Sequence, residues 1–226
     1  MQFSENWLRT FVNPAISSAE LSHALTMAGL EVEEMTPVAP AFGNIVIGEI
    51  IEAVKHPDAD RLQVCKVNIG KEILQIVCGA SNARVGLKAP CALVGAELPG
   101  ISIKAAKVRG VESFGMMCSA KELGLAAEAS GLLELPSDAP TGQDIRQYLD
   151  LNDHALTLKL TPNRADCLSI LGIARDVAAI TGAPVTLPAI DAANIESATV
   201  QTVSVDAIDA CPAYYGRVIE AVNAQA

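Results

Sequence analysis

The stretch IVIGEIIEAVKHPDADRLQVCKVNIG, residues 45–70, decides the fold of the central part of this sequence. Both of its ends are rich in β-branched and other apolar residues, which favour strands, and HPDADR between them has the proline and aspartates of a tight turn. Leu62 and Val64 share one face of the second strand, whereas Val67 and Ile69 share the other, so we predict a β-bulge between the two pairs. The stretch therefore predicts two strands joined by a turn.

Further short apolar segments follow this pair of strands. The segments EILQIVCGA, PCALVGAEL, SIKAAKVRGV and GLLELP are strand candidates, and glycine and turn residues separate them. In RGVESFGMMCSAKELGL, residues 109–125, Ser119 and Glu122 have capping-box spacing and Gly124 supplies a stop, which predicts one short helix. About five short strands and one small helix are typical of a closed or nearly closed OB-fold β-barrel.

Helical patterns flank the predicted barrel on both sides. A short helix is predicted over residues 5–12, and Ser17 with Glu20 forms a capping box before a helix over residues 18–28. LEVEEM and HALTLKL alternate as half-buried strands do. The segment CLSILGIARDVAAITG predicts a last helix, whose apolar stripe is Ile170, Ile173, Val177 and Ile180.

The two flanks are each too short to bury a core alone, so we predict that they pack together. The expected fold class is α+β, with an OB-fold barrel (residues 39–148) inserted into a small α/β domain made of residues 1–38 and 149–190. Residues 185–199 have the composition of a linker. Two strand-like runs in TVSVDAIDACPAYYGRVIEAV predict that residues 200–226 are the first strands of a further domain.

Composition excludes several classes of protein. No stretch approaches the roughly 18 apolar residues of a membrane span, and the N-terminus lacks a signal-peptide pattern, so we expect a soluble, cytoplasmic protein. The six cysteines lie at least 13 residues apart and mostly among aliphatic residues, which favours buried thiols over zinc ligands or disulfides. HPDADR offers an imidazole and two carboxylates but no third or fourth ligand at workable spacing, so a turn is favoured over a metal loop.

The charge distribution is more informative than the net charge of −10. That total argues against a general nucleic-acid binder, yet 11 of the 16 Lys and Arg residues fall within residues 40–148. Lys104, Lys107 and Arg109 lie on one predicted strand and its exit, on a fold whose open face often holds oligonucleotides. A solvated face explains most lysines equally well, and the segment has few aromatic residues for base stacking. An RNA-binding barrel and a packing module both stay open.

Catalysis by Cys118 is a third hypothesis. A nucleophilic thiol needs a base or a cationic environment, and none of the three histidines lies in a catalytic motif. Glycines beside lysines in NIGKEI and VGLKAP lack the order of a phosphate-binding loop. We therefore expect no catalytic residue, no metal site and no nucleotide site, and a Cys118→Ser variant would test the thiol hypothesis.

Several long motifs, in fixed order, resemble one family. HPDADRLQVCKVNIG, QIVCGASNARVGLKAPCALVGAELPG, KVRGVESFGMMCSAKELGL and TPNRADCLSILGIARDVAAITG are similar to the N-terminal third of the bacterial phenylalanyl-tRNA synthetase β subunit. NWLRTFV and LTMAGLEVEEM match the start of that family, so the resemblance covers nearly all of the sequence. RGVESFGM also resembles the hallmark of the wider group of tRNA-binding OB domains.

The resemblance implies a function that the residues alone do not give. The family's enzyme is an α2β2 heterotetramer that attaches phenylalanine to its tRNA with ATP and magnesium, and its aminoacylation site lies on the α subunit. We therefore expect this fragment to be noncatalytic, to need no cofactor itself, and to contact tRNA, the α subunit and the remaining β-subunit domains. Residues 200–226 would begin the editing module of B3/B4 type; family members often have Arg where this sequence has Ala213.

The resemblance also supports tRNA contact through basic residues of the barrel. Phosphate contact by Lys104, Lys107 and Arg109 is the leading hypothesis, and Ser113 and Met116 are expected to shape the barrel wall. The full set of candidate tRNA-binding residues is Lys55, Arg61, Lys66, Asn82, Arg84, Lys88, Lys104, Lys107 and Arg109. The alternatives are a free-standing OB-fold RNA-binding protein and a purely structural packing module.

Overall fold

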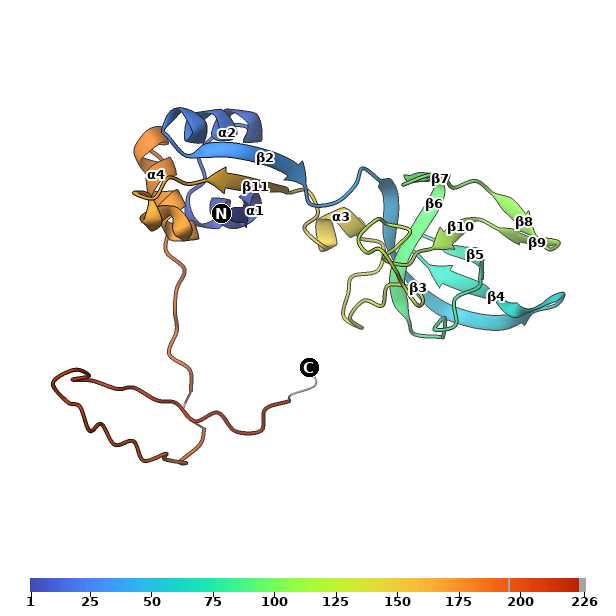
Figure 1. The fold of residues 1–226 in the computed structure, drawn as a ribbon. Helices are drawn as coiled ribbons and strands as arrows, with labels where there is room; N and C mark the ends of the chain where they lie inside the picture. The colour runs from blue at the N-terminus through green and yellow to red at the C-terminus, as the bar shows by residue number, and fades with distance from the viewer. Residues whose placement is uncertain (195, 224–226) are drawn as a thin grey trace. The chain divides into compact units, whose positions relative to one another are not determined.

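A computed structural model describes residues 1–194 and 196–223 as a mixed α+β structure with antiparallel sheets (Figure 1). Its contacts divide the chain into two compact units, Met1–Thr186 and Leu187–Ala226. None of the helices in the described part of the chain combines the length and the apolar character that crossing a membrane requires.

The two flanks of the central segment meet in one three-stranded sheet. Its strands are β1 (Gln2–Ser4), β11 (His154–Lys159) and β2 (Glu31–Pro37), in the antiparallel order β1-β11-β2. Leu156 pairs with Phe3 on one side and with Met35 on the other, so β11 is the central strand. Residues that are about 150 positions apart in the sequence therefore share one ladder, as the sequence predicts.

Three α-helices and one 3-10 helix pack around this sheet. They are α1 (Glu5–Phe11), α2 (Ser18–Met27), η1 (Ala165–Leu168) and α4 (Ile170–Thr181). The core that they share with the sheet draws on both flanks: Phe3, Leu8, Val12, Leu21, Leu25, Leu30, Leu156, Leu158, Cys167, Ile170, Ile173, Ala174 and Val177. This core is what makes the two flanks fold together.

Local capping explains where these helices begin and end. The capping box of Ser17 and Glu20 is present at the start of α2, which confirms the predicted helix. Ser169 caps α4, and Gly182, at φ 74°, ends it in the left-handed conformation that glycine tolerates. The apolar stripe of α4 is shorter than predicted, because Ile180 is 40% exposed and Val177 is the last buried member.

The central segment forms a second antiparallel sheet. Its strands are β3 (Gly43–His56), β4 (Ala59–Asn68), β5 (Ile73–Cys78), β6 (Lys88–Leu98), β7 (Ile101–Ser102) and β10 (Gly115–Met117). The order is β10-β6-β3-β4-β5, with β7 paired to β6. A separate ribbon joins β8 (Ala106–Val108) to β9 (Val111–Ser113), and helix α3 (Ile145–Tyr148) follows after a long loop.

The ladders of the described strands do not close this sheet into a barrel. The gap lies between β5 and the segment from β9 to β10, where a backbone hydrogen bond from Phe114 N–H to the Gln75 carbonyl (2.9 Å) crosses it. The buried Ser113 adds a second link, because its Oγ accepts from the Val77 amide (3.1 Å) and donates to the Gly115 carbonyl (3.1 Å). The edges are therefore bridged by individual bonds rather than by a ladder.

The predicted bulge on the second strand was wrong. The register shifts between Ile50 and Glu52, so the extra residue lies on β3, and β4 keeps its alternation from residue 63 to residue 68. Cys65 is buried on the same face as Val67, which leaves Leu62 and Val64 on the opposite, half-exposed face. The strand has apolar side chains on both of its faces, and the sequence pattern that this produces was misinterpreted as a bulge.

Three further predictions about the central segment were wrong. SIKAAKVRGV is not one strand: it begins at the last residue of β7, passes an irregular stretch over residues 103–105 and then β8, and ends at the first residue of β9. GLLELP forms only an isolated bridge between Leu135 and Lys88. Residues 120–124 form a turn rather than a helix, although the Ser119 amide does donate to Glu122 Oε2 (2.6 Å).

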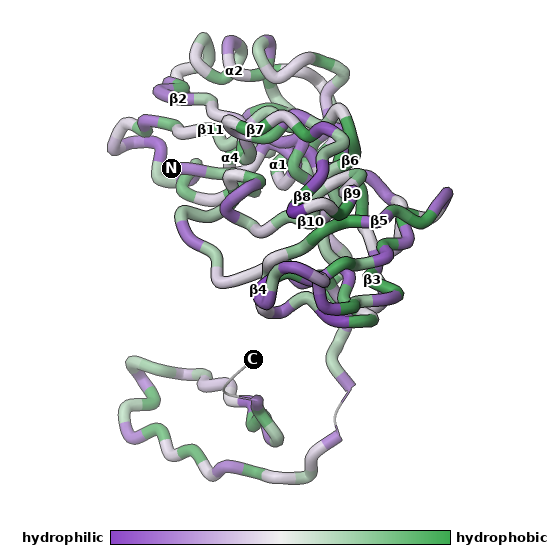
Figure 2. Tube along the Cα trace, turned by 90° about the vertical axis from the view of Figure 1, so that its right-hand side faces the viewer, coloured by the Kyte–Doolittle hydropathy of each residue, from purple (hydrophilic) through white to green (hydrophobic). Residues whose placement is uncertain are grey.

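The unit Leu187–Ala226 has no helix or strand within its described residues, so the two strand-like runs predicted there do not form strands. Its large apolar side chains are mostly exposed; Ile190, Val200 and Ile219 are examples. Figure 2 shows stretches of hydrophobic residues in green along the trace of this unit. The apolar residues of this unit are thus not packed into a core.

Candidate nucleic-acid interface

The nine candidate RNA-contacting side chains fall into three groups according to their partners. Asn82, Arg84 and Lys88 hydrogen-bond within the protein. Lys66 and Lys107 form ion pairs at the surface. Lys55, Arg61, Lys104 and Arg109 are exposed and have no ion pair or side-chain hydrogen bond within the part of the chain that the structure describes.

The first group holds the loop over residues 131–139 against the sheet. The Asn82 amide donates to the Leu132 carbonyl (3.1 Å) and accepts from the Leu132 amide (2.9 Å). Arg84 makes a bidentate pair with Glu134, at 2.8 and 2.7 Å. Hydrogen bonds from Arg84 and Asn82 hold the pKa of Glu134 at about 2, below its ordinary value.

Lys88 serves the same loop, because its Nζ donates to the Ala139 carbonyl (2.7 Å) and its side chain is half-buried. The three side chains of this group therefore connect segments of the fold to each other. Their internal hydrogen bonds compete with any contact to a phosphate.

The second group remains available to a ligand. Lys66 pairs with Glu52 at 2.6 Å and Lys107 with Glu112 at 3.6 Å, and all four side chains are about half-exposed or more. Exposed pairs of this kind contribute little to stability and exchange readily with solvent ions.

The third group does not lie on a single strand. Lys55 is near the end of β3, and Arg109 lies in the turn between β8 and β9 with a left-handed φ of 47°. Lys104 lies in the irregular stretch before β8, so the prediction that Lys104, Lys107 and Arg109 lie on one strand and its exit was wrong. Lys55 pairs with Gln63, and His56 pairs with Ala59. Residues 60–62 of β4 therefore have no partner in the ladder, and Arg61 is the middle one of them.

A buried histidine brings two of these locations together. His56 is 4% exposed; its Nδ1 accepts from the Asp58 amide (3.0 Å) and its Nε2 lies 3.1 Å from the Val108 carbonyl. A carbonyl only accepts, so Nε2 carries the proton and the ring is the neutral tautomer. The β3–β4 turn is therefore bonded to the β8–β9 turn, although their sequences are 52 residues apart.

We call Lys55, Arg61, Lys107 and Arg109 the cationic turns, because the first two flank the β3–β4 turn and the last two flank or occupy the β8–β9 turn. Asp58, Asp60 and Glu112 lie in the same turns, so the local excess of positive charge is small. The sequence signal for the arrangement is HPD at residues 56–58: it indicates the turn, but not the partner of His56 across the sheet.

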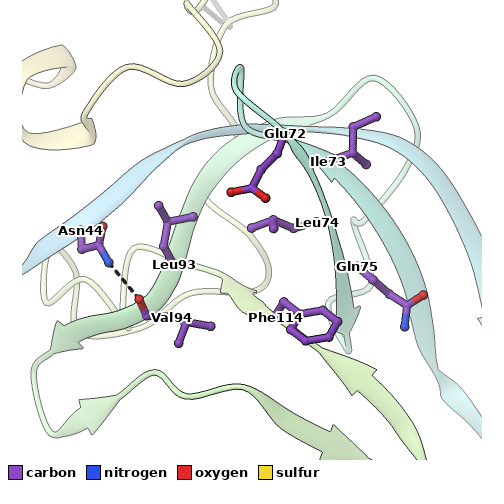
Figure 3. A pocket seen from close by; sticks show the side chains of 8 residues that line it. All are labelled: Asn44, Glu72, Ile73, Leu74, Gln75, Leu93, Val94 and Phe114. Atoms are coloured by element: carbon purple, nitrogen blue, oxygen red, sulfur yellow. Dashed lines mark hydrogen bonds between the residues drawn. The ribbon is translucent and has the colours of Figure 1, made fainter.

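A groove elsewhere on the central segment has a different chemical character. It has a volume of about 690 Å³ and is lined by Asn44, Glu72, Ile73, Leu74, Gln75, Leu93, Val94 and Phe114 (Figure 3). The Asn44 amide donates to the Val94 carbonyl (3.1 Å), and the Glu72 carboxylate is the only charged group of the lining. The groove therefore suits an apolar or aromatic group, and it has no cation for a phosphate.

The structure gives no support to catalysis by Cys118. The thiol is fully buried, and burial together with the Glu122 carboxylate raises its pKa to about 12. A thiol with this pKa is not the thiolate that nucleophilic attack requires. The turn predicted within HPDADR is present at Pro57 and Asp58, between the end of β3 and the start of β4. Both ring nitrogens of His56 already bond to backbone groups.

One cluster in the described part of the chain combines donors that could ligate a metal, namely Asp166, Cys167 and Asp176. Arg164 already bonds to both carboxylates, at 3.3 Å for Asp166 and at shorter range for Asp176. The guanidinium supplies the positive charge that a metal would otherwise bring, so this donor set does not fit Mg²⁺. Within the TPNRADC motif, Arg164 therefore connects η1 to α4 through its ion pairs.

Comparisons with known proteins match the central segment to one family and the whole chain to longer relatives. Residues 45–144 match the family described as "Putative tRNA binding domain". Over its whole length the chain is 64% identical to the "Phenylalanine--tRNA ligase beta subunit" of Dechloromonas aromatica (strain RCB) and 60% identical to that of Aromatoleum aromaticum. The chain spans 29% of the length of each of these relatives. A solved MetRS related protein from Pyrococcus horikoshii is 22% identical over 45% of this chain and 87% of its own, with a TM-score of 0.34.

Proposed function

Because this chain corresponds to the N-terminal region of phenylalanine–tRNA ligase β subunits and contains a tRNA-binding domain, we propose that it contacts the phosphates of tRNA. The observation that carries the proposal is a set of exposed cations that have no partner among the described residues, on a segment that matches a tRNA-binding family: Lys55, Arg61, Lys104 and Arg109. Ordered cations of this kind release counterions when they meet a nucleic-acid backbone, and this release favours binding.

The chain's contribution to the larger enzyme follows from the same correspondence. We propose that the whole protein acts in ATP- and magnesium-dependent attachment of phenylalanine to tRNA, in the cytoplasm, with an α subunit as its partner. The chemistry would lie on that partner, since the buried, high-pKa Cys118 and the Arg164-filled acidic cluster offer no reactive group here. This chain would supply tRNA contact and subunit architecture.

The division into domains is part of the proposal. We propose an OB-type module over residues 39–148 inserted into a domain formed by residues 1–38 and 149–190; the sheet β1-β11-β2 and its shared core support it. Residues 200–226 would begin the editing module. Support for this comes from the exposed apolar side chains of that segment, which a module completed by further residues would bury.

The test is the affinity of the chain for a tRNA transcript, measured at several salt concentrations. The variant replaces the four free cations together: Lys55→Gln, Arg61→Gln, Lys104→Gln and Arg109→Gln. If each contacts a phosphate, the slope of log K against log salt falls by about 3, since each contact contributes about 0.7–0.9.

The matched control removes four other exposed cations that have no partner in the described part of the chain. These are Lys71, Lys121, Arg175 and Arg217, so the two variants have the same net charge. We expect the control to retain the wild-type slope. Equal slopes for all three proteins would show that the four proposed residues do not contact RNA, and would favour the packing-module alternative.

A further inference from the structure

We propose that His56 is a positioning residue that holds the β3–β4 turn against the β8–β9 turn, so that the cationic turns meet RNA as one site. The proposal rests on the proposed function for its ligand, the phosphate backbone of tRNA. His56 itself is buried and would not touch the RNA; it would act through Arg61 and Arg109.

The first argument is the way in which His56 is bonded. A buried imidazole needs partners for both nitrogens, and it finds one in each turn: the Asp58 amide at 3.0 Å and the Val108 carbonyl at 3.1 Å. The ring therefore stabilises the neighbouring turn and reaches across to the second hairpin with the same neutral tautomer. The β3–β4 turn can form with the bond to Asp58 alone, without the bond to Val108.

The second argument is the weak attachment of the β8–β9 ribbon. Its strands pair only with each other, and its other links to the main sheet are at its base, through Glu112, Ser113 and Phe114. Among the described residues, His56 Nε2 to Val108 is the one hydrogen bond that joins residues 106–110 to an element outside the β8–β9 ribbon. Without it, the tip that carries Arg109 would be tethered only at its base.

Two conservative variants separate the roles of the two bonds. In His56→Asn the side-chain oxygen can still accept from the Asp58 amide, as in an Asx turn, but the shorter side chain cannot reach Val108. In His56→Gln the amide nitrogen extends to about the position of Nε2 and can donate to the Val108 carbonyl. The first variant keeps the turn and loses the connection; the second keeps the connection.

The experiment measures two quantities on the 226-residue chain. The first is amide hydrogen exchange of residues 106–111, which we expect to be faster in His56→Asn and close to wild type in His56→Gln. The second is affinity for a tRNA transcript. We expect His56→Asn to lose about as much affinity as Arg109→Gln, roughly three- to tenfold for one or two phosphate contacts, and His56→Gln to lose little.

A double variant tests whether His56 acts through Arg109. If it does, adding Arg109→Gln to His56→Asn causes little further loss of affinity, because the tip is already displaced. Fully additive losses would overturn the proposal, and so would unchanged exchange of residues 106–111 in His56→Asn. If Arg61→Gln and Arg109→Gln themselves leave affinity unchanged, the proposed phosphate contact fails; hydrogen exchange then decides separately whether His56 joins the two turns.

Discussion

The Glu134 carboxylate holds the side chains of Arg84 and Asn82 in place by hydrogen bonds. Both side chains bond to its carboxylate, and together they tie the loop over residues 131–134 to the end of β5 and the segment after it. Sequence alone does not show whether a basic residue and an amide in a predicted RNA-binding loop bind a ligand or another part of the protein. The position of one carboxylate, 50 residues away along the chain, gives Arg84 a bond within the fold that the sequence does not indicate.

The Arg84–Glu134 pair predicts a pH dependence of stability. The pKa of Glu134 is lowered from 4.5 to about 2 in the folded chain, so the unfolded state binds its proton first as pH falls. The stabilisation is therefore complete above pH 4.5 and is lost as the pH falls towards 2. Melting temperatures of wild type and Glu134→Gln should differ at pH 6 and converge between about pH 4.5 and 2. A difference that stays constant down to pH 2 would contradict this.

His56 is the residue whose role sequence reasoning missed. Its neighbours Pro57 and Asp58 predict a turn, because local geometry suffices to make one. Its second partner, Val108, comes from another hairpin, and no periodicity or composition near residue 56 refers to it. Local devices such as the Ser17–Glu20 capping box are predictable from sequence, whereas a bond between distant turns depends on the tertiary fold.

Secondary-structure elements also differ in whether local sequence or tertiary contacts determine them. The helices α1, α2 and α4 were predictable because each combines a cap with an apolar stripe. SIKAAKVRGV alternates polar and apolar residues like a strand, but most of its residues are exposed. The regular pairing with β6 ends at Ser102, and beyond it only Ile103 makes backbone hydrogen bonds to β6. Alternation predicts a strand only where a partner strand is available.

The contact between η1 and α4 predicts a strong effect of one glycine. A Cβ at Gly172 would lie 2.7 Å from the carbonyl carbon of Asp166 and 3.2 Å from the Cys167 amide nitrogen, and neither backbone group can move independently of η1. We expect Gly172→Ala to destabilise the protein by about 1–3 kcal/mol, although alanine favours helices. Denaturant unfolding gives the value.

The control for this substitution is Gly216→Ala, at a position where an added Cβ would meet no atom within 4 Å. Its effect should stay within about 0.5 kcal/mol, as for most surface substitutions. Equal effects of the two substitutions would mean that the approach of Gly172 to η1 is not what determines the stability of α4.

At the scale of the whole molecule, the register of β2 and β11 explains how a long central segment can interrupt a small domain. Pro37 pairs with His154, and the Val38 amide donates to the Asp153 carbonyl (3.1 Å). The chain therefore leaves and re-enters the three-stranded sheet at adjacent points, as the two strands of a hairpin do. An insertion at such a point leaves the host core intact, since none of the host's buried residues lies between residues 38 and 152.

This geometry predicts that the host domain folds without the central segment. Joining residues 1–38 to residues 153–186 through Asn-Gly would replace the insertion by a two-residue hairpin turn at the point where the strands already pair. Asp153 is retained because its carboxylate accepts from Ser4 Oγ (2.6 Å) and from the Asn6 amide (2.9 Å). We expect a cooperative thermal transition by circular dichroism, with a stability of only a few kcal/mol because the domain is small.

The matched control carries Leu156→Asp in the same shortened chain. Leu156 is fully buried on the central strand β11, and an unpaired carboxylate there should prevent folding altogether. A shortened chain that melts without cooperativity, like its Leu156→Asp control, would mean that the core of the two flanks depends on the central segment. The flanks would then be extensions of that segment, and the boundaries proposed at residues 38 and 149 would have to be abandoned.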